Sequence, residues 1–221
     1  YLENIGGRGM KKSTTGLFGI LVLLLASLWM TGCQDLKNVK ESTVTVDKKG
    51  AVTEALVEDF SAENYDAEEL KDSVKKLVKS YNAQVGKERV TIQQMEVRGG
   101  TAKVTLHFET DEDYRGFNQT DFFSGTVKEA MEAEYPFSGA FLDQDGKKTT
   151  EGQVPGQCQD AQVLILKEPL QVLVPGNILY VSENMEILGK DQAKLSNDTR
   201  IPYENAQTVT EAYGYVIYSA E

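Results

Sequence analysis

Histidine and cysteine are scarce in this chain of 221 residues, which contains one histidine, His107, and two cysteines, Cys33 and Cys158. One histidine cannot supply the paired ligands of a zinc-peptidase helix or a histidine-rich metal site. The Gly-x-Ser-x-Gly pattern of many serine hydrolases is also absent. The sequence therefore predicts no metal ion, no cofactor and no catalytic residue, although a pair of catalytic carboxylates among its many acidic residues stays open.

Cys33 is assigned to the N-terminal export signal discussed below. His107 and Cys158 are then the only residues that could form a catalytic cysteine–histidine dyad. Cys158 has no basic neighbour in the segment 156–160 to lower the pKa of its thiol, so a partly buried, inert thiol is expected. His107 lies on a predicted strand whose even-numbered residues face the core. It should therefore point outward, together with Lys103, Thr105 and Glu109.

Positive charge is also lacking, since the formal net charge is -11. Residues 1–32 contain three basic side chains and one acidic side chain, a balance of +2, so residues 33–221 carry -13. A surface of this sign repels the phosphates of nucleic acids and anionic lipid headgroups. Nucleic acid is therefore excluded as a partner, and attachment to a membrane would require a covalent anchor.

Long hydrophobic runs are missing as well, because the longest, residues 17–30, has 14 residues. As a helix it would be about 21 Å long, whereas the hydrocarbon core of a bilayer is about 30 Å thick. Lys11 and Lys12 precede this run, and Thr31-Gly32-Cys33 follows it. This order of charged, apolar and small residues is typical of a secretory signal peptide.

The segment Met30-Thr31-Gly32-Cys33 resembles the lipobox of bacterial lipoproteins, with methionine where leucine is commonest. The resemblance implies that a diacylglycerol group is attached to the thiol of Cys33 and that a signal peptidase cleaves between Gly32 and Cys33. Two acyl chains give a stable membrane anchor, whereas one is marginal. We therefore expect a location on the outer face of the cytoplasmic membrane, in the cell envelope.

The chain divides into four predicted segments. Residues 1–9 are expected to lie upstream of the true start at Met10, because Tyr1 is no initiator and Gly6-Gly7-Arg8-Gly9 is what a translated ribosome-binding site would give. Residues 10–32 are the signal peptide, 33–42 a polar tether and 43–221 a globular domain. Residues 143–162 are polar and predict a long loop or a subdomain boundary. Fully extended, the tether reaches about 30 Å, so the domain should lie close to the bilayer.

Hydrophobic periodicity predicts an α+β fold. Helices are expected at 66–85 and from Thr126 to just before Pro136, and strands at 43–46, 51–57, 90–97, 102–109, 163–166, 170–174, 178–181, 185–188 and 213–218. This order favours an antiparallel sheet with two main helices on one face and a strand-rich C-terminal part. Whether the C-terminal strands extend the sheet or fold separately stays open.

The helix at 66–85 has the most complete set of signals. Asp66 is a predicted N-cap and Gly86 a predicted C-terminal stop. A stripe at helical spacing should pack on the sheet, and it consists of Leu70, Val74, Leu77, Val78 and Tyr81.

Two further groups of side chains could bind a ligand. The acidic run Glu109, Asp111, Glu112 and Asp113 is interpreted as a solvated helix cap, with a weak site for a cation or cationic ligand as the alternative. Tyr213 and Tyr215 could form a platform for a sugar. Because Val216 and Tyr218 make the other face of the same strand apolar too, an internal strand is the preferred interpretation. The only tryptophan, Trp29, lies in the signal peptide, which also counts against a carbohydrate site.

Four segments of the predicted domain resemble uncharacterised surface lipoproteins of Gram-positive anaerobes, namely Thr43-Val44-Thr45-Val46, Val57-Glu58-Asp59-Phe60, Asp113-Tyr114 with Phe117-Asn118, and Phe122-Phe123-Ser124-Gly125-Thr126. The resemblance implies a location and no activity. We therefore expect a membrane-anchored, non-catalytic module that binds an unknown protein or small molecule. The alternatives are a cell-envelope hydrolase that uses acidic residues and a solute-binding component associated with a transporter.

Overall fold

The computed structural model describes residues 36–196 and 213–219, and residues Gln34–Glu221 form one compact unit. The expected upstream residues 1–9, the signal peptide 10–32 and Cys33 lie outside the described residues. No helix of the described part is both long enough and apolar enough to span a membrane.

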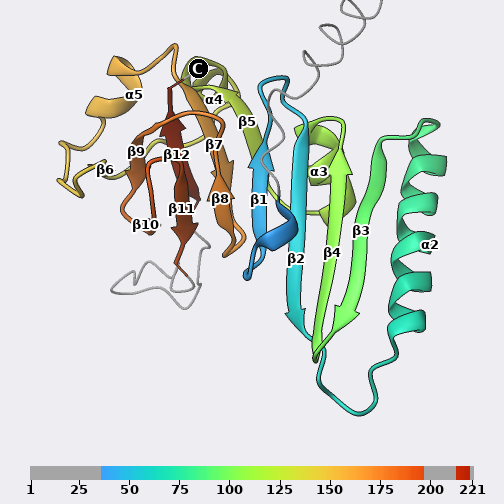
Figure 1. The fold of residues 1–221 in the computed structure, drawn as a ribbon. Coiled ribbons are helices and arrows are strands. Elements are labelled where there is room, and N and C mark those ends of the chain that lie inside the picture. Colours follow the sequence, from blue (N-terminus) through green and yellow to red (C-terminus); the bar gives the residue numbers. More distant parts are fainter. Residues whose placement is uncertain (1–35, 197–212, 220–221) are drawn as a thin grey trace, which may run out of the picture. The chain divides into compact units, whose positions relative to one another are not determined.

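The described strands form two sheets (Figure 1). One sheet contains β1 (Thr43–Val46), β2 (Val52–Asp59), β3 (Val90–Arg98), β4 (Thr101–Phe108), β8 (Gln171–Leu173), β10 (Met185–Ile187) and β11 (Gln192–Leu195). The other contains β5 (Phe122–Thr126), β6 (Phe141–Asp143), β7 (Gln162–Leu166), β9 (Ile178–Ser182) and β12 (Gly214–Tyr218). The helices are η2 (Leu36–Asn38), α2 (Ala67–Val85), α3 (Asp111–Asn118), α4 (Val127–Glu132) and α5 (Gln153–Gln157).

The strand order is β10-β11-β8-β1-β2-β4-β3 in the seven-stranded sheet and β5-β7-β12-β9-β6 in the five-stranded sheet. All paired strands are antiparallel except β1 and β8. The α+β class is therefore confirmed. The C-terminal strands are divided between the sheets, because β8, β10 and β11 extend the first while β7, β9 and β12 build the second.

Side chains from both sheets contribute to one hydrophobic core, including Val44, Phe108, Leu164 and Val216. A second cluster uses the opposite side of β7 and β12, where Ile165 and Ile217 pack with residues of α4 and α5. Strand β12 is thus buried on both faces, as predicted for an internal strand.

Helix α2 begins after Asp66, whose carboxylate accepts hydrogen bonds from the backbone N–H groups of Glu68 and Glu69, and ends at Gly86 in the left-handed conformation. Both predicted ends are confirmed. The helix packs against β3 with Val78 buried, but Leu77 is 61% exposed, so its predicted place in the core is wrong. Because neighbouring residues of a helix point about 100° apart, burying Val78 turns Leu77 outward.

Strand β4 buries Ala102, Val104, Leu106 and Phe108, as the alternation predicts. Thr105, which was expected to point outward on the other face of the strand, is covered and only 5% exposed. Helix η2 covers this side of the sheet, where the ammonium of Lys103 donates a hydrogen bond of 2.8 Å to the carbonyl of Leu36. Part of the expected tether, from Leu36 onward, therefore packs on the sheet.

Helix α3 links the two sheets, because it contacts β4 of one and β5 of the other. Its residue Tyr114 is completely buried, with ring centroids 5.1 Å from Phe108 on β4 and 4.4 Å from Phe122 on β5. The position of α3 is therefore determined by aromatic packing on both sides.

Candidate functional site

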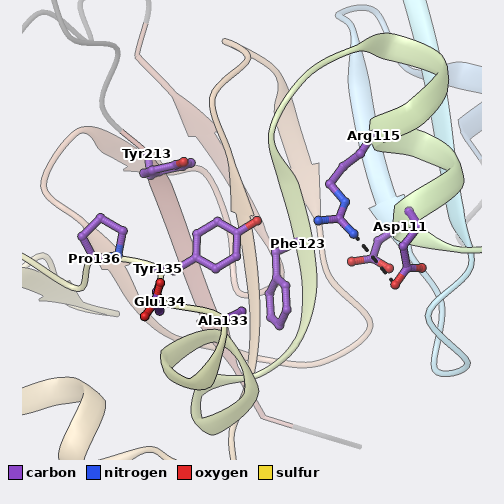
Figure 2. A pocket seen from close by; sticks show the side chains of 9 residues that line it. Asp111, Arg115, Phe123, Ala133, Glu134, Tyr135, Pro136 and Tyr213 are labelled. Carbon is purple, nitrogen blue, oxygen red and sulfur yellow. Dashed lines mark ion pairs between the residues drawn. The ribbon is translucent and has the colours of Figure 1, made fainter.

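A pocket of about 390 Å³ opens beside α3 (Figure 2). It is lined by Asp111, Glu112 and Arg115 of α3, by Phe123 of β5, by Ala133, Glu134, Tyr135 and Pro136 after α4, and by Tyr213 before β12. From the sequence, Asp111 was assigned to the acidic run and Tyr213 to a separate tyrosine pair. The fold places both residues at one pocket.

The turn after α4 brings Tyr135 to the pocket. Thr126 and Glu129 form a reciprocal capping box that starts the helix as predicted, but the helix ends at Glu132, short of the expected end near Pro136. Glu134 adopts the left-handed conformation with φ of +62°, and the backbone N–H of Tyr135 donates to the carbonyl of Ala130 at 3.0 Å. This turn carried no recognisable sequence signal, because glutamate is not typical of left-handed positions.

Aromatic rings form one wall of the pocket. The centroid of the Tyr135 ring lies 5.2 Å from that of Phe123 and 5.5 Å from that of Tyr213. The hydroxyl of Tyr213 donates to Asp121 at 3.1 Å, which fixes the orientation of its ring. The centroid of the Tyr215 ring lies 6.2 Å from that of Tyr213, but Tyr215 is only 4% exposed, so the two rings do not form a surface platform for a sugar.

Charged groups of α3 form the other wall (Figure 2). Burial, the hydrogen bond with Glu112 and the charge of Glu112 together raise the pKa of Asp111 to about 6. The same hydrogen bond from Asp111 lowers the pKa of Glu112. Arg115 lies 3.8 Å from the Glu112 carboxylate and completes this wall.

The acidic run predicted as a solvated cap is divided between three environments. Glu109 is exposed, but Asp113 is buried and accepts a hydrogen bond of 2.9 Å from Thr110, so the prediction is wrong for Asp113. Tyr81 of α2 also donates to Asp113 at 3.3 Å. Asp113 therefore joins α2 to α3, and only Asp111 and Glu112 reach the pocket.

His107 and Cys158 are not brought together as a dyad. The ring of His107 lies 3.2 Å from the hydroxyl of Thr53 and 3.9 Å from the carboxylate of Glu109. Cys158 follows α5 and packs against the second hydrophobic cluster, and burial raises the pKa of its thiol. The expectation of a partly buried thiol is confirmed, and its low reactivity stays a prediction.

A second group of acidic residues lies in the core beneath α3. Glu54 of β2 is only 2% exposed, and its two carboxyl oxygens lie 3.0 Å from the hydroxyl of Tyr114 and 3.3 Å from the amide nitrogen of Asn118. The same Tyr114 hydroxyl lies 2.9 Å from the carboxyl of Glu168, which follows β7. The alternation of Val52, Glu54 and Leu56 could have revealed an inward carboxyl, but no sequence signal indicates its partners.

The geometry of this group requires an additional proton. A neutral tyrosine has one hydroxyl hydrogen, so it can donate to only one of the two carboxyls. The other short contact is a hydrogen bond only if that carboxyl keeps its own proton. Burial and the charge of Glu168 raise the pKa of Glu54 to about 7, and burial raises the pKa of Glu168 as well. The pair therefore holds a proton at pH values where exposed glutamates are ionised.

Within residues 36–196 and 213–219, no group of three or more His, Cys, Asp or Glu side chains is arranged to hold a metal ion. At Asp143, whose surroundings resemble the start of a calcium loop, the carboxylate accepts hydrogen bonds from the backbone N–H groups of Asp145 and Lys147, as in a tight turn. Compared with known proteins, the chain matches no family model, no curated protein and no solved structure.

Proposed function

We propose that this protein is a lipoprotein of the cell envelope, anchored through Cys33, whose domain binds a small molecule in the pocket between α3 and Tyr135. The pocket is the observation that carries the proposal. Its volume of about 390 Å³ lies in the range of small-molecule sites, roughly 300–1,000 Å³. It also combines aromatic rings with a few charged groups, which is the usual composition of such sites.

Replacing Tyr135 by alanine should weaken binding in this pocket. The ring contacts both Phe123 and Tyr213, so its removal opens the aromatic wall. Loss of one stacking side chain costs about 1–3 kcal/mol where aromatic side chains stack on nucleic-acid bases, equivalent to roughly 5- to 150-fold in affinity. We would screen monosaccharides, amino acids and small amines by saturation-transfer NMR with the full chain in nonionic detergent, and compare Tyr135→Ala with the wild-type protein.

Tyr65→Ala is the matched control, because Tyr65 is 53% exposed and its ring packs on Phe60, which does not line the pocket. Any compound that binds in the pocket should bind this variant as it binds the wild-type protein. If every compound of the screen gave the same signal with wild-type protein and Tyr135→Ala, the proposed pocket function would be wrong.

The anchor makes a separate prediction. Cells that produce the protein and are fed an alkyne-bearing fatty acid should incorporate the label into the wild-type protein, and Cys33→Ser should lose all of it because the thioether can no longer form. Cys158→Ser is the control and should keep the label, since Cys158 lies beyond the proposed signal and tether. Label on Cys33→Ser, or none on the wild-type protein, would contradict the anchor.

A hydrolase is the second candidate, supported by the unequal pKa values of Asp111 and Glu112. Two carboxyls whose environments separate their pKa values can act as acid and base. Turnover of a glycoside or ester substrate that is lost in Glu112→Gln would favour this function over binding alone.

A further inference from the structure

The neighbouring strands β1, β2, β4 and β3 have one face turned away from the hydrophobic core, which we call the outer face. Helices α2 and α3 pack on the core face, because Val78 and Tyr114 belong to the same cluster of buried side chains as Val104 of β4. The strand pairing places the odd-numbered side chains of β1, β2 and β4 on the outer face, together with their partners on β3. The short helix η2 also lies on the outer face.

The chain enters the domain on this outer face. Leu36, the first described residue, is 3% exposed, and its carbonyl accepts a hydrogen bond of 2.8 Å from the ammonium of Lys103. The same ammonium donates to the carbonyl of Val39 at 3.4 Å. Cys33 precedes Leu36 by three residues, which reach about 11 Å at most when extended. Lipid attached to Cys33 would therefore hold the outer face close to the bilayer.

The outer face also differs in charge from the rest of the domain. It carries two carboxylates and two cations on its four strands, a net charge of zero, namely Asp59, Glu96, Arg98 and Lys103. Residues 33–221 together carry -13, so the excess of acid lies on other surfaces. Anionic headgroups repel acidic surfaces. A neutral face therefore meets the bilayer at a lower electrostatic cost than the acidic surfaces do.

We propose that the outer face docks on the lipid headgroups of the membrane that holds Cys33. The inference rests on the proposed lipid anchor and adds an orientation to it. Docking in this way leaves the pocket accessible, because its aromatic residues Phe123, Tyr135 and Tyr213 pack with the second hydrophobic cluster, on the side of the five-stranded sheet that is turned away from the outer face.

Energy transfer from two labelled positions to the membrane tests the orientation. The full lipidated chain with Cys158→Ser is labelled with a fluorophore at Thr101→Cys, an exposed position of the outer face, or at Met131→Cys, which is 43% exposed on α4. Each protein is added to phosphatidylcholine vesicles that contain phosphatidylglycerol and an acceptor-labelled lipid. Layers of sheet and helix, each about 10 Å thick, separate the two positions, so the label at Thr101 should lie about 20 Å closer to the headgroups and show roughly twofold higher transfer.

Two changes test the causes of the orientation separately. A flexible insertion of about 15 Gly and Ser residues between Gln34 and Asp35, with a mean span of roughly 20 Å, should reduce the difference between the labels because the domain can then turn. Thr91→Glu adds a negative charge to the outer face and should reduce the difference in anionic vesicles but not in pure phosphatidylcholine. Gln153→Glu on α5 is the matched control and should leave the difference unchanged.

The outcomes distinguish the orientation from the anchor. If the lipidated protein sediments with the vesicles but transfer at Thr101 does not exceed that at Met131, the anchor stands and the inference of docking is wrong. A difference that neither the insertion nor Thr91→Glu reduces would also contradict it. If the wild-type protein carries no lipid and stays in the supernatant, both the anchor and the inference fail.

Discussion

The variant Glu54→Gln should be more stable than the wild-type protein at pH 8 and equally stable near pH 4.5. Glu54 lies in the core between the hydroxyl of Tyr114 and the amide of Asn118, and burial and the charge of Glu168 raise its pKa to about 7. Glutamine has nearly the same shape and can keep hydrogen bonds to these partners without ionising.

The sign of the effect follows from proton binding. Below the pKa of an unfolded glutamate, about 4.3, both the folded and the unfolded states are protonated, and the contribution of Glu54 to stability is fully present. As the pH rises through the folded pKa of about 7, this contribution is lost, because the unfolded state releases its proton first. The loss amounts to about 3 kcal/mol, and roughly 6–12 °C in Tm for a domain of this size.

Thermal unfolding followed by circular dichroism from pH 4.5 to 8 measures this effect as the difference between Glu54→Gln and wild type. Glu58→Gln is the control, since Glu58 lies on the same strand and is exposed, and its difference from wild type should not vary in this way. A constant difference between Glu54→Gln and wild type across the range would show that Glu54 is ionised in the folded protein.

Local signals in the sequence predicted the individual elements well. The helix at 67–85 has both an N-cap and a glycine stop, and the hairpin of β3 and β4 turns at Gly99 and Gly100, which have φ of +60° and +76°. These features depend on neighbouring residues, so they can be read from one stretch of chain. The strands β5, β6 and β11 were missed, because they are short and acquire their pattern from partners distant in sequence.

The candidate site could be predicted only in part. Asp111, Glu112 and Tyr213 were recognised as side chains that could bind a ligand. About a hundred residues separate the two acids from Tyr213, so the sequence gave no reason to place them at one site. Tyr135 was expected at the end of a helix that stops before Pro136, whereas the helix ends at Glu132. Glu54 lies on β2 and Glu168 in the loop that follows β7 of the other sheet, so only the tertiary structure brings them both to Tyr114.

Gly176→Ala should strongly destabilise the domain, because the backbone of Ser219, just after β12, lies directly against this glycine. A Cβ atom at Gly176 would overlap the carbonyl oxygen of Ser219, at the end of β12. The next residue, Asn177, exchanges hydrogen bonds with Ser219, since the backbone N–H of Ser219 donates to Asn177 at 2.9 Å and the Ser219 hydroxyl accepts at 3.0 Å. The backbone must therefore shift, and these bonds must lengthen or break.

We expect a loss of about 3 kcal/mol, the upper end of the usual range for overpacking, because the overlapping atom belongs to the backbone, and this loss corresponds to roughly 6–12 °C in Tm. Gly156→Ala is the matched control, because Gly156 lies in α5 and no atom comes within 4 Å of the place that a Cβ atom would take there. That change should leave Tm unchanged or raise it slightly, since alanine favours a helix over glycine by about 1 kcal/mol. Chemical denaturation at pH 7 measures the stability of both variants. Equal midpoints for Gly176→Ala and wild type would show that β12 can move away from β9.

Because Tyr213 immediately precedes β12, a displacement of this strand should also weaken binding in the pocket. The variant Gly176→Ala therefore links the packing of the five-stranded sheet to the proposed site.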